Sequence, residues 1–93
     1  MRTWILCIDK AVAKVFAKEG TDEQPRLCYT LKSSHRSKTN FLKYVAEEME
    51  LAAGAGTDNQ LEVYGEADLL KKLTKKFSHE VRHSIRQSVA IGA

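Results

Sequence analysis

The chain has 93 residues, 43% of them hydrophobic and 29% charged, with a formal net charge of +3. This length leaves room for one hydrophobic core, and the balance is typical of a globular protein, which argues against a second domain and against a disordered chain. The strongest apolar run near the start, residues 4–8, is too short for a membrane span or a signal-peptide core. We therefore expect one cytoplasmic domain, residues 1–93, without a membrane segment.

The first three predicted elements are strands. Residues 3–8 form a nearly continuous apolar run, which is typical of a central strand buried on both faces. A short turn at Asp9 leads into residues 11–18, which alternate between apolar and polar positions as a second strand. Residues 27–32 alternate again as a third. The three strands should pair as an antiparallel meander, with the first at or near the middle of the sheet.

An amphipathic helix and a fourth strand follow. Apolar residues recur at helical spacing at Phe41, Leu42, Val45, Met49 and Ala52. Thr39 or Asn40 is suited to cap the start of this helix, and Gly54 and Gly56 should end it. Residues 60–64 then return to strand composition.

A second helix begins near Glu66, and its apolar stripe consists of Leu69, Leu70, Leu73 and Phe77. Ser78 could cap another short helical turn, and residues 87–91 are predicted to be the last strand. The order is strand, strand, strand, helix, strand, helix, strand. It predicts an α/β fold with a single mixed five-stranded sheet, in which helices pack on the sheet and right-handed crossovers join parallel later strands.

The two cysteines, Cys7 and Cys28, lie in predicted strands, and no Cys-x-x-Cys motif is present. Nothing in the sequence indicates a secretory context in which they would be oxidised. We expect reduced core thiols, with no metal bound.

Charge is distributed unevenly, because residues 47–62 are acidic and residues 71–86 are basic. Lysines on the outer face of the second helix, with a basic loop before the first, could contact phosphates, although such a face is also typical of an ordinary solvated helix. The candidate nucleic-acid-binding residues are Arg36, Lys38, Lys71, Lys72, Lys75, Lys76, Arg82 and Arg86. No aromatic stacking platform accompanies them, so electrostatic contact with a structured RNA such as the ribosome is favoured over sequence-specific reading.

The start of the chain resembles the bacterial host-attachment protein family. Trp4-Ile-Leu-Cys-Ile-Asp9 followed by Ala11-Val-Ala-Lys-Val-Phe16 is similar to its apolar first strand ending in Asp and its second strand rich in small residues. Residues 41–48, 60–65 and 69–73 resemble its first helix, fourth strand and second helix. The family usually carries a long polar insertion between the third strand and the first helix, where this chain has only about eight residues.

That family is in turn similar to the central domain of archaeal and eukaryotic peptide-chain release factors, a translational machinery component. The resemblance implies an RNase H-like mixed sheet. Release factors carry Gly-Gly-Gln in the loop before the first long helix, whereas residues 35–40 here read His-Arg-Ser-Lys-Thr-Asn. Peptidyl-tRNA hydrolysis by that route is therefore not supported.

Asp9 stands where RNase H-like nucleases place their first metal-binding carboxylate. A two-metal site needs further carboxylates nearby, and Glu47, Glu48 or Glu66 would have to supply them. Asp9 equally suits a tight turn through side-chain hydrogen bonds, and this interpretation is preferred.

The run His79-Glu-Val-Arg-His83 matches the metalloprotease pattern His-Glu-x-x-His. The two histidines would bind Zn²⁺ and Glu80 would activate water, with His35 as the other histidine available for a third ligand. A fortuitous match is favoured, because only about two turns of helix fit between Ser78 and the last strand.

Three functional hypotheses follow. The preferred one is a non-catalytic binding module without a cofactor, whose basic face meets ribosomal or other RNA. The alternatives are a zinc-dependent hydrolase using His79, Glu80 and His83, and a structural protein that forms a homo-oligomer through an exposed sheet edge.

Overall fold

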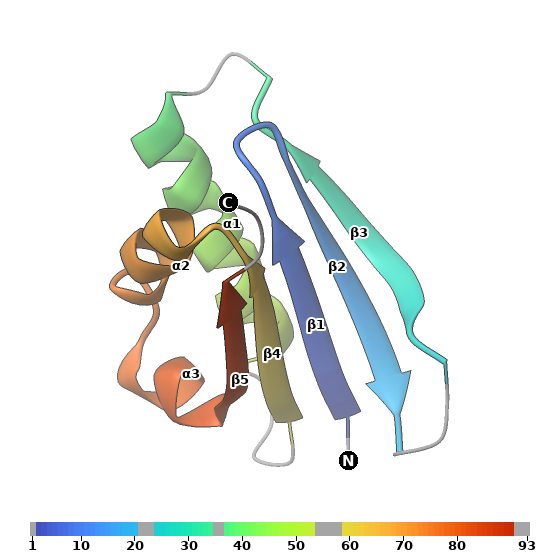
Figure 1. The fold of residues 1–93 in the computed structure, drawn as a ribbon. Helices are drawn as coiled ribbons and strands as arrows, with labels where there is room; N and C mark the ends of the chain where they lie inside the picture. The colour runs from blue at the N-terminus through green and yellow to red at the C-terminus, as the bar shows by residue number, and fades with distance from the viewer. Residues whose placement is uncertain (1, 21–23, 35–36, 54–58, 91–93) are drawn as a thin grey trace.

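The computed structural model describes residues 2–20, 24–34, 37–53 and 59–90. In chain order the elements are β1 (Arg2–Ile8), β2 (Val12–Glu19), β3 (Arg26–Lys32), α1 (Lys38–Ala53), β4 (Asn59–Gly65), α2 (Ala67–Thr74), α3 (His79–Ser84) and β5 (Ile85–Ala90), as Figure 1 shows. None of the helices in these residues is long and apolar enough to span a membrane.

The five strands form one mixed sheet in the order β3-β2-β1-β4-β5. β1, β2 and β3 pair antiparallel, whereas β4 runs parallel to both β1 and β5. This arrangement confirms the predicted α/β fold, the N-terminal meander and the central position of the first strand.

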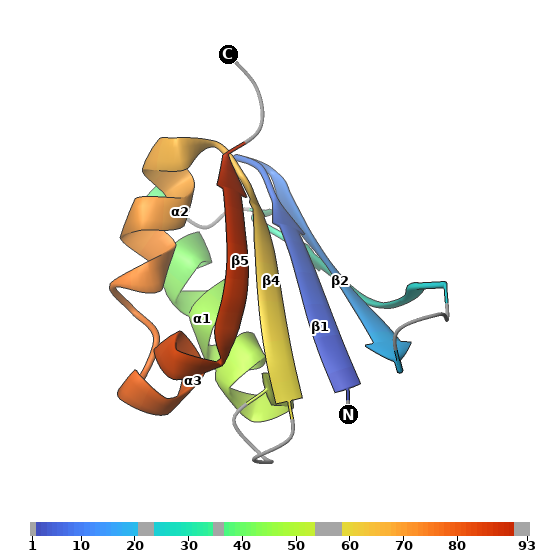
Figure 2. The same ribbon diagram turned by 60° about the horizontal axis from the view of Figure 1, so that its bottom comes forward.

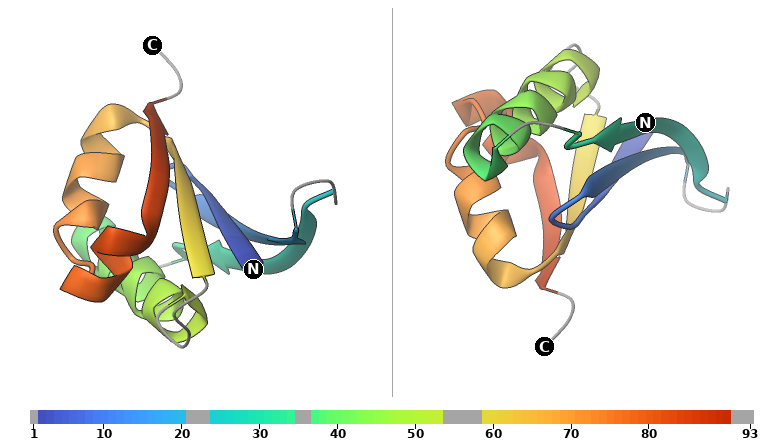
Figure 3. Two further views of the ribbon diagram at one scale, coloured as in Figure 1. Left: turned by 90° about the horizontal axis from the view of Figure 1, so that it is seen from below. Right: turned by 90° about the horizontal axis from the view of Figure 1, so that it is seen from above.

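All three helices lie on one face of the sheet (Figures 2 and 3). Trp4, Leu6 and Ile8 of β1 point to this face and are buried, whereas Ile5 and Cys7 point to the opposite face and are only half-buried. The prediction that the first strand is buried on both faces therefore holds only in part, because Thr3 is the one β1 residue on that opposite face that is buried. We call the side without helices the open face.

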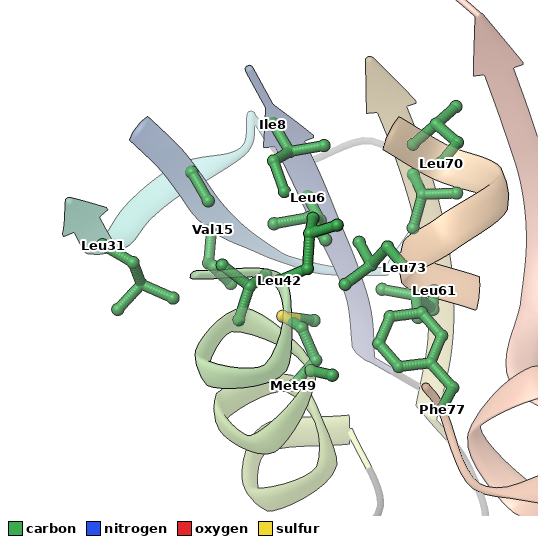
Figure 4. Close-up of a cluster of buried hydrophobic side chains, with 14 of the residues drawn as sticks. Leu6, Ile8, Val15, Leu31, Leu42, Met49, Leu61, Leu70, Leu73 and Phe77 are labelled. Carbon is green, nitrogen blue, oxygen red and sulfur yellow. The ribbon is translucent and has the colours of Figure 1, made fainter. Parts of the chain in front are cut away.

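The core fills the space between the sheet and the helices. Figure 4 shows side chains from β1 and β4 meeting those of α1 and α2, and the labelled ones include Leu6, Leu42, Met49, Leu61 and Leu73. Phe77 follows the end of α2 and is nevertheless buried, with only 2% of its surface exposed, so the predicted apolar stripe continues into the turn after the helix. Each large apolar side chain that is fully buried stabilises the fold by about 1.5–3 kcal/mol, and the sum of these contributions holds the helices on the sheet.

The third strand lies at an edge of the sheet, and the first helix begins earlier than predicted. β3 lies at the edge of the sheet, so Leu27 and Tyr29 are 50% and 48% exposed and Leu31 alone in this strand is buried. The cap of α1 is Ser37, whose hydroxyl accepts the Asn40 backbone N–H at 3.3 Å, because α1 already begins at Lys38. The predicted stop at residues 54 and 56 lies outside the described residues.

Both cysteines are free thiols. Burial raises the pKa of the Cys7 thiol, and the nearby Lys14 opposes this shift only in part. Cys28 is exposed on β3, so its predicted place in the core is wrong. Burial of Cys7 therefore disfavours the thiolate that a reactive cysteine requires.

Candidate nucleic-acid interface

The candidate interface is built on α2. Leu69, Leu70 and Leu73 are buried against the sheet, and this fixes which side of the helix faces solvent. The four lysines at positions 71, 72, 75 and 76 occupy the remaining directions, and all four are exposed. The buried stripe of α2 therefore places a row of cations on the molecular surface.

Asp68 links this row to the start of α1. Its carboxylate lies 3.2 Å from Lys72 Nζ, one turn away on α2, and 3.6 Å from Lys38 Nζ in the first turn of α1. The hydrogen bond and charge of Lys72, with a smaller effect of Lys38, lower the pKa of Asp68. We call these five lysines, which come from α1, α2 and the residues just after α2, the α2 basic face: Lys38, Lys71, Lys72, Lys75 and Lys76.

Three of these five lysines are not neutralised by the described part of the chain. No ion pair joins Lys71, Lys75 or Lys76 to an acidic residue in the ranges that the structure covers. A depression of about 280 Å³ between α1 and α2 is lined by Thr39, Leu42, Lys72, Lys75 and Lys76. The face thus combines unpaired positive charge with a shallow hollow.

The other predicted contact residues lie in different places. The Arg82 guanidinium donates to the carbonyl oxygens of Phe77 at 3.1 Å and Lys75 at 3.4 Å, so this side chain fastens the turn between α2 and α3. Arg86 donates to Gln60 Oε1 at 2.8 Å. Gln60 alternates with buried residues of β4, so this contact lies toward the open face and away from the lysines. Arg36 lies outside the described residues.

The His-Glu-x-x-His motif forms α3, which has six residues and begins at the cap Ser78, as predicted. The rings of His79 and His83 lie 4.4 Å apart, centroid to centroid, at 75°. Within the described ranges, no group of three or more His, Cys, Asp or Glu side chains could hold a metal ion. His35, the predicted source of a third ligand, lies outside those ranges.

Asp9 acts as a turn residue. Its Oδ1 accepts the backbone N–H groups of Ala11 at 2.7 Å and Val12 at 2.8 Å, and its own N–H donates to the Val12 carbonyl oxygen. Bonds of this kind close the short connection between β1 and β2. The structure confirms the turn interpretation.

A second hollow, between α2 and β5, was not predicted. It has a volume of about 470 Å³, and its lining consists of Ala67, Leu70, Lys71, Thr74, Lys75, Arg82, Ser88 and Ala90. We call it the α2–β5 groove. The only sequence signal for this groove is the pair of small residues at positions 88 and 90 of the last strand. This signal becomes informative only when β5 is known to be an edge strand beside α2.

No protein-family model and no curated protein matches this sequence. Solved structures match in fold over 99% of the chain: an archaeal protein (TM-score 0.76, 12% identity), an archaeal translation termination factor (0.72, 12%) and Pelota from Archaeoglobus fulgidus (0.67, 17%). The chain has a release-factor-like fold. It spans 30%, 31% and 27% of those three chains, and at these identities the likeness establishes the fold alone.

Proposed function

We propose that this chain is a non-catalytic binding module that contacts structured RNA, such as ribosomal RNA, through the α2 basic face. The observation that carries the proposal is the concentration of five exposed lysines around one helix, of which only Lys38 and Lys72 share a described carboxylate, that of Asp68. The release-factor-like fold, found also in a translation termination factor, supports a role in translation.

The physical basis is electrostatic. Lysine ammonium groups on a helix surface meet phosphate oxygens and release condensed counterions, which makes binding strongly dependent on salt. They carry little base information, so the module would follow the shape of a folded RNA backbone rather than its sequence. Five phosphate contacts would give a slope of log K against log salt of roughly −3.5 to −4.5.

The proposal has three further parts. The 93 residues act as one domain, this domain works in the cytoplasm, and it is related to the host-attachment proteins, as the sequence pattern of β1 and β2 suggests. Cosedimentation of the native protein with ribosomal particles, measured in cell extracts at low salt, tests the partner, and fluorescence microscopy of the tagged protein in intact cells tests the location. A protein that stays at the top of the gradient at low salt contradicts the ribosomal partner.

Purified components give a sharper test. Binding to ribosomes and to a structured ribosomal RNA fragment is measured between about 50 and 200 mM salt. Replacing Lys71, Lys75 and Lys76 with glutamine should reduce the salt slope by roughly 2–3. The matched control replaces three exposed lysines away from α2, in the β1–β2 turn and on β2 and β3: Lys10, Lys14 and Lys32.

The control variant has the same net charge as the α2 variant and should bind almost as well as the unmodified chain. Equal losses in the two variants would show that overall charge, and not the α2 basic face, drives the interaction. Absence of binding at low salt, or binding that salt does not weaken, would refute the proposal.

A further inference from the structure

β5 is an edge strand whose outer side pairs with no other strand of the described chain. Figure 2 shows it in front, with β4 on one side and α2 beside it on the helix-bearing face. An unpaired edge offers a row of backbone N–H and C=O groups to another extended chain. Gln87, Ser88 and Ala90 are exposed and Val89 is partly buried, which agrees with an uncovered edge.

The two edges of the sheet are not protected equally. β3 has a basic residue at each end, Arg26 and Lys32, and its pairing with β2 is interrupted by a register shift. Beyond the irregularity near Ile85, residues 87–90 of β5 contain no charge and no proline. Charge, bulges and proline are the usual means by which an edge avoids pairing with other chains, so β5 is the more receptive edge.

The α2–β5 groove runs beside this edge. Ser88 and Ala90 pair with Val63 and Gly65, which are buried on the helix-bearing side, so these two small side chains leave the hollow open beneath α2. Much of the lining of the groove is apolar, and it includes Leu70. A strand added to β5 would direct every second side chain toward it.

The charge of the groove selects the partner. Lys71, Lys75 and Arg82 line it together with apolar and hydroxyl side chains, and none of its lining residues is acidic. We propose that β5 binds an extended acidic segment of another protein as a sixth strand, with acidic and apolar side chains entering the α2–β5 groove. Main-chain hydrogen bonds would supply affinity and the groove would supply specificity.

Two other occupants fit less well. Antiparallel pairing of β5 with a second copy about a two-fold axis would put both helix layers on one side of the joined sheet, with the two sets of Lys71, Lys75 and Arg82 facing each other. RNA lacks the peptide groups that pair with a strand edge, and it gains nothing from an apolar lining. Since Lys71 and Lys75 belong both to the groove and to the α2 basic face, an acidic segment and RNA should compete.

The test uses the ¹⁵N-labelled 93-residue chain and a synthetic blocked peptide, Thr-Val-Thr-Glu-Thr-Val-Thr-Glu-Thr, in which valine and glutamate take turns at every second position and so share one face of the strand. The expected result is a chemical-shift change and slower hydrogen exchange at the backbone amides of β5. Ser88→Leu, which fills the groove, should weaken peptide binding by about tenfold or more and leave RNA binding unchanged. Lys76→Gln, outside the groove, should weaken RNA binding and spare the peptide.

Ser88 is exposed, so its replacement should preserve the fold, and a dispersed amide spectrum verifies this. Ala90→Leu provides a second way to fill the groove. The proposal is overturned if the peptide fails to bind at millimolar concentration or shifts amides elsewhere, or if a peptide with lysine in place of glutamate binds equally well. It is also overturned if an RNA oligonucleotide protects the β5 amides, or if the chain alone forms a dimer that protects them.

Discussion

Replacing Gly65 with alanine should destabilise the fold by forcing β4 away from β1. Gly65 is the buried last residue of β4 and pairs with Ile8 of β1. A Cβ atom at this position would lie 2.6 Å from the Ile8 carbonyl oxygen and 2.9 Å from Ile8 Cγ2. Cβ contacts under 3.0 Å essentially never occur. Because the closer atom belongs to the backbone, a side-chain rotation cannot relieve the clash.

The magnitude follows from two opposing effects. Overpacking a well-packed interior costs about 1–3 kcal/mol. Removing the backbone freedom of glycine from the unfolded chain returns about 0.4–1 kcal/mol, since Gly65 does not have a positive φ and alanine can adopt its conformation. We expect a net loss of about 1–2 kcal/mol in the free energy of unfolding, which lowers the melting temperature by roughly 4–16 °C.

Urea and thermal unfolding of Gly65→Ala provide the measurement, and Gly20 provides the matched control. Gly20 has φ +71°, and no heavy atom lies within 4 Å of the position that an alanine Cβ would take, so alanine there costs only backbone strain. Asparagine tolerates that conformation and should recover stability at position 20, whereas at position 65 it should be worse than alanine. A Gly65→Ala variant as stable as the original would show that β4 moves from β1 without cost, and would refute the reasoning.

Three further predictions address other parts of the molecule. Glu50→Ala removes the carboxylate that accepts the Ser78 backbone N–H at 2.5 Å, so the free energy of unfolding, measured with urea, should fall by about 1–3 kcal/mol. The control Glu47→Ala, at an exposed site, should change it by less than about 0.5 kcal/mol. Equal losses in the two variants would contradict the role of Glu50. The hydrogen bond from Tyr64 to Glu62, with desolvation, raises the Tyr64 pKa to about 12. The stabilising effect of this hydrogen bond is therefore complete below pH 10 and is lost as pH rises toward 12. Glu62→Gln should shift the phenolate absorbance titration to lower pH, and an unshifted titration would contradict the assignment. Equimolar Zn²⁺ should leave the melting temperature unchanged, because the described residues give the histidine pair of α3 no third ligand, and a rise of several degrees would favour the hydrolase alternative.

The elements that the sequence predicted correctly depend on local chemistry. The turn at Asp9 and the cap at Ser78 are each made by hydrogen bonds within three residues along the chain. The apolar stripe of α2 repeats at helical spacing, and this alone determines which side its lysines occupy. The mixed sheet with the first strand at its middle could also be predicted, because a meander and two right-handed crossovers leave few topologies for five strands.

What could not be predicted depends on where distant elements pack. An alternating strand such as β3 has the same pattern whether or not a helix covers it, so the exposure of Leu27 and Tyr29 was invisible in the sequence. The half-buried Ile5 has the same cause, since no local signal shows that all the helices share one face. Arg86 is separated from the lysines by the irregular pairing at the start of β5, which a regular alternation does not anticipate. The α2–β5 groove likewise requires knowledge of the edge.

The central position of β1 has a consequence for the order in which the chain folds. Ile8 of β1 pairs with Ala13 of β2 across a short turn. Ile8 also pairs with Gly65 of β4, but β3 and α1 lie between these two residues in the sequence. Contacts that close short loops form sooner than those that close long ones, so the meander should be present before β4 arrives. Until β4 arrives, the side of β1 that will pair with β4 is open, so this apolar strand can pair with neighbouring chains. Recovery on refolding should therefore fall as protein concentration rises, although both sides of β1 are paired once folding is complete.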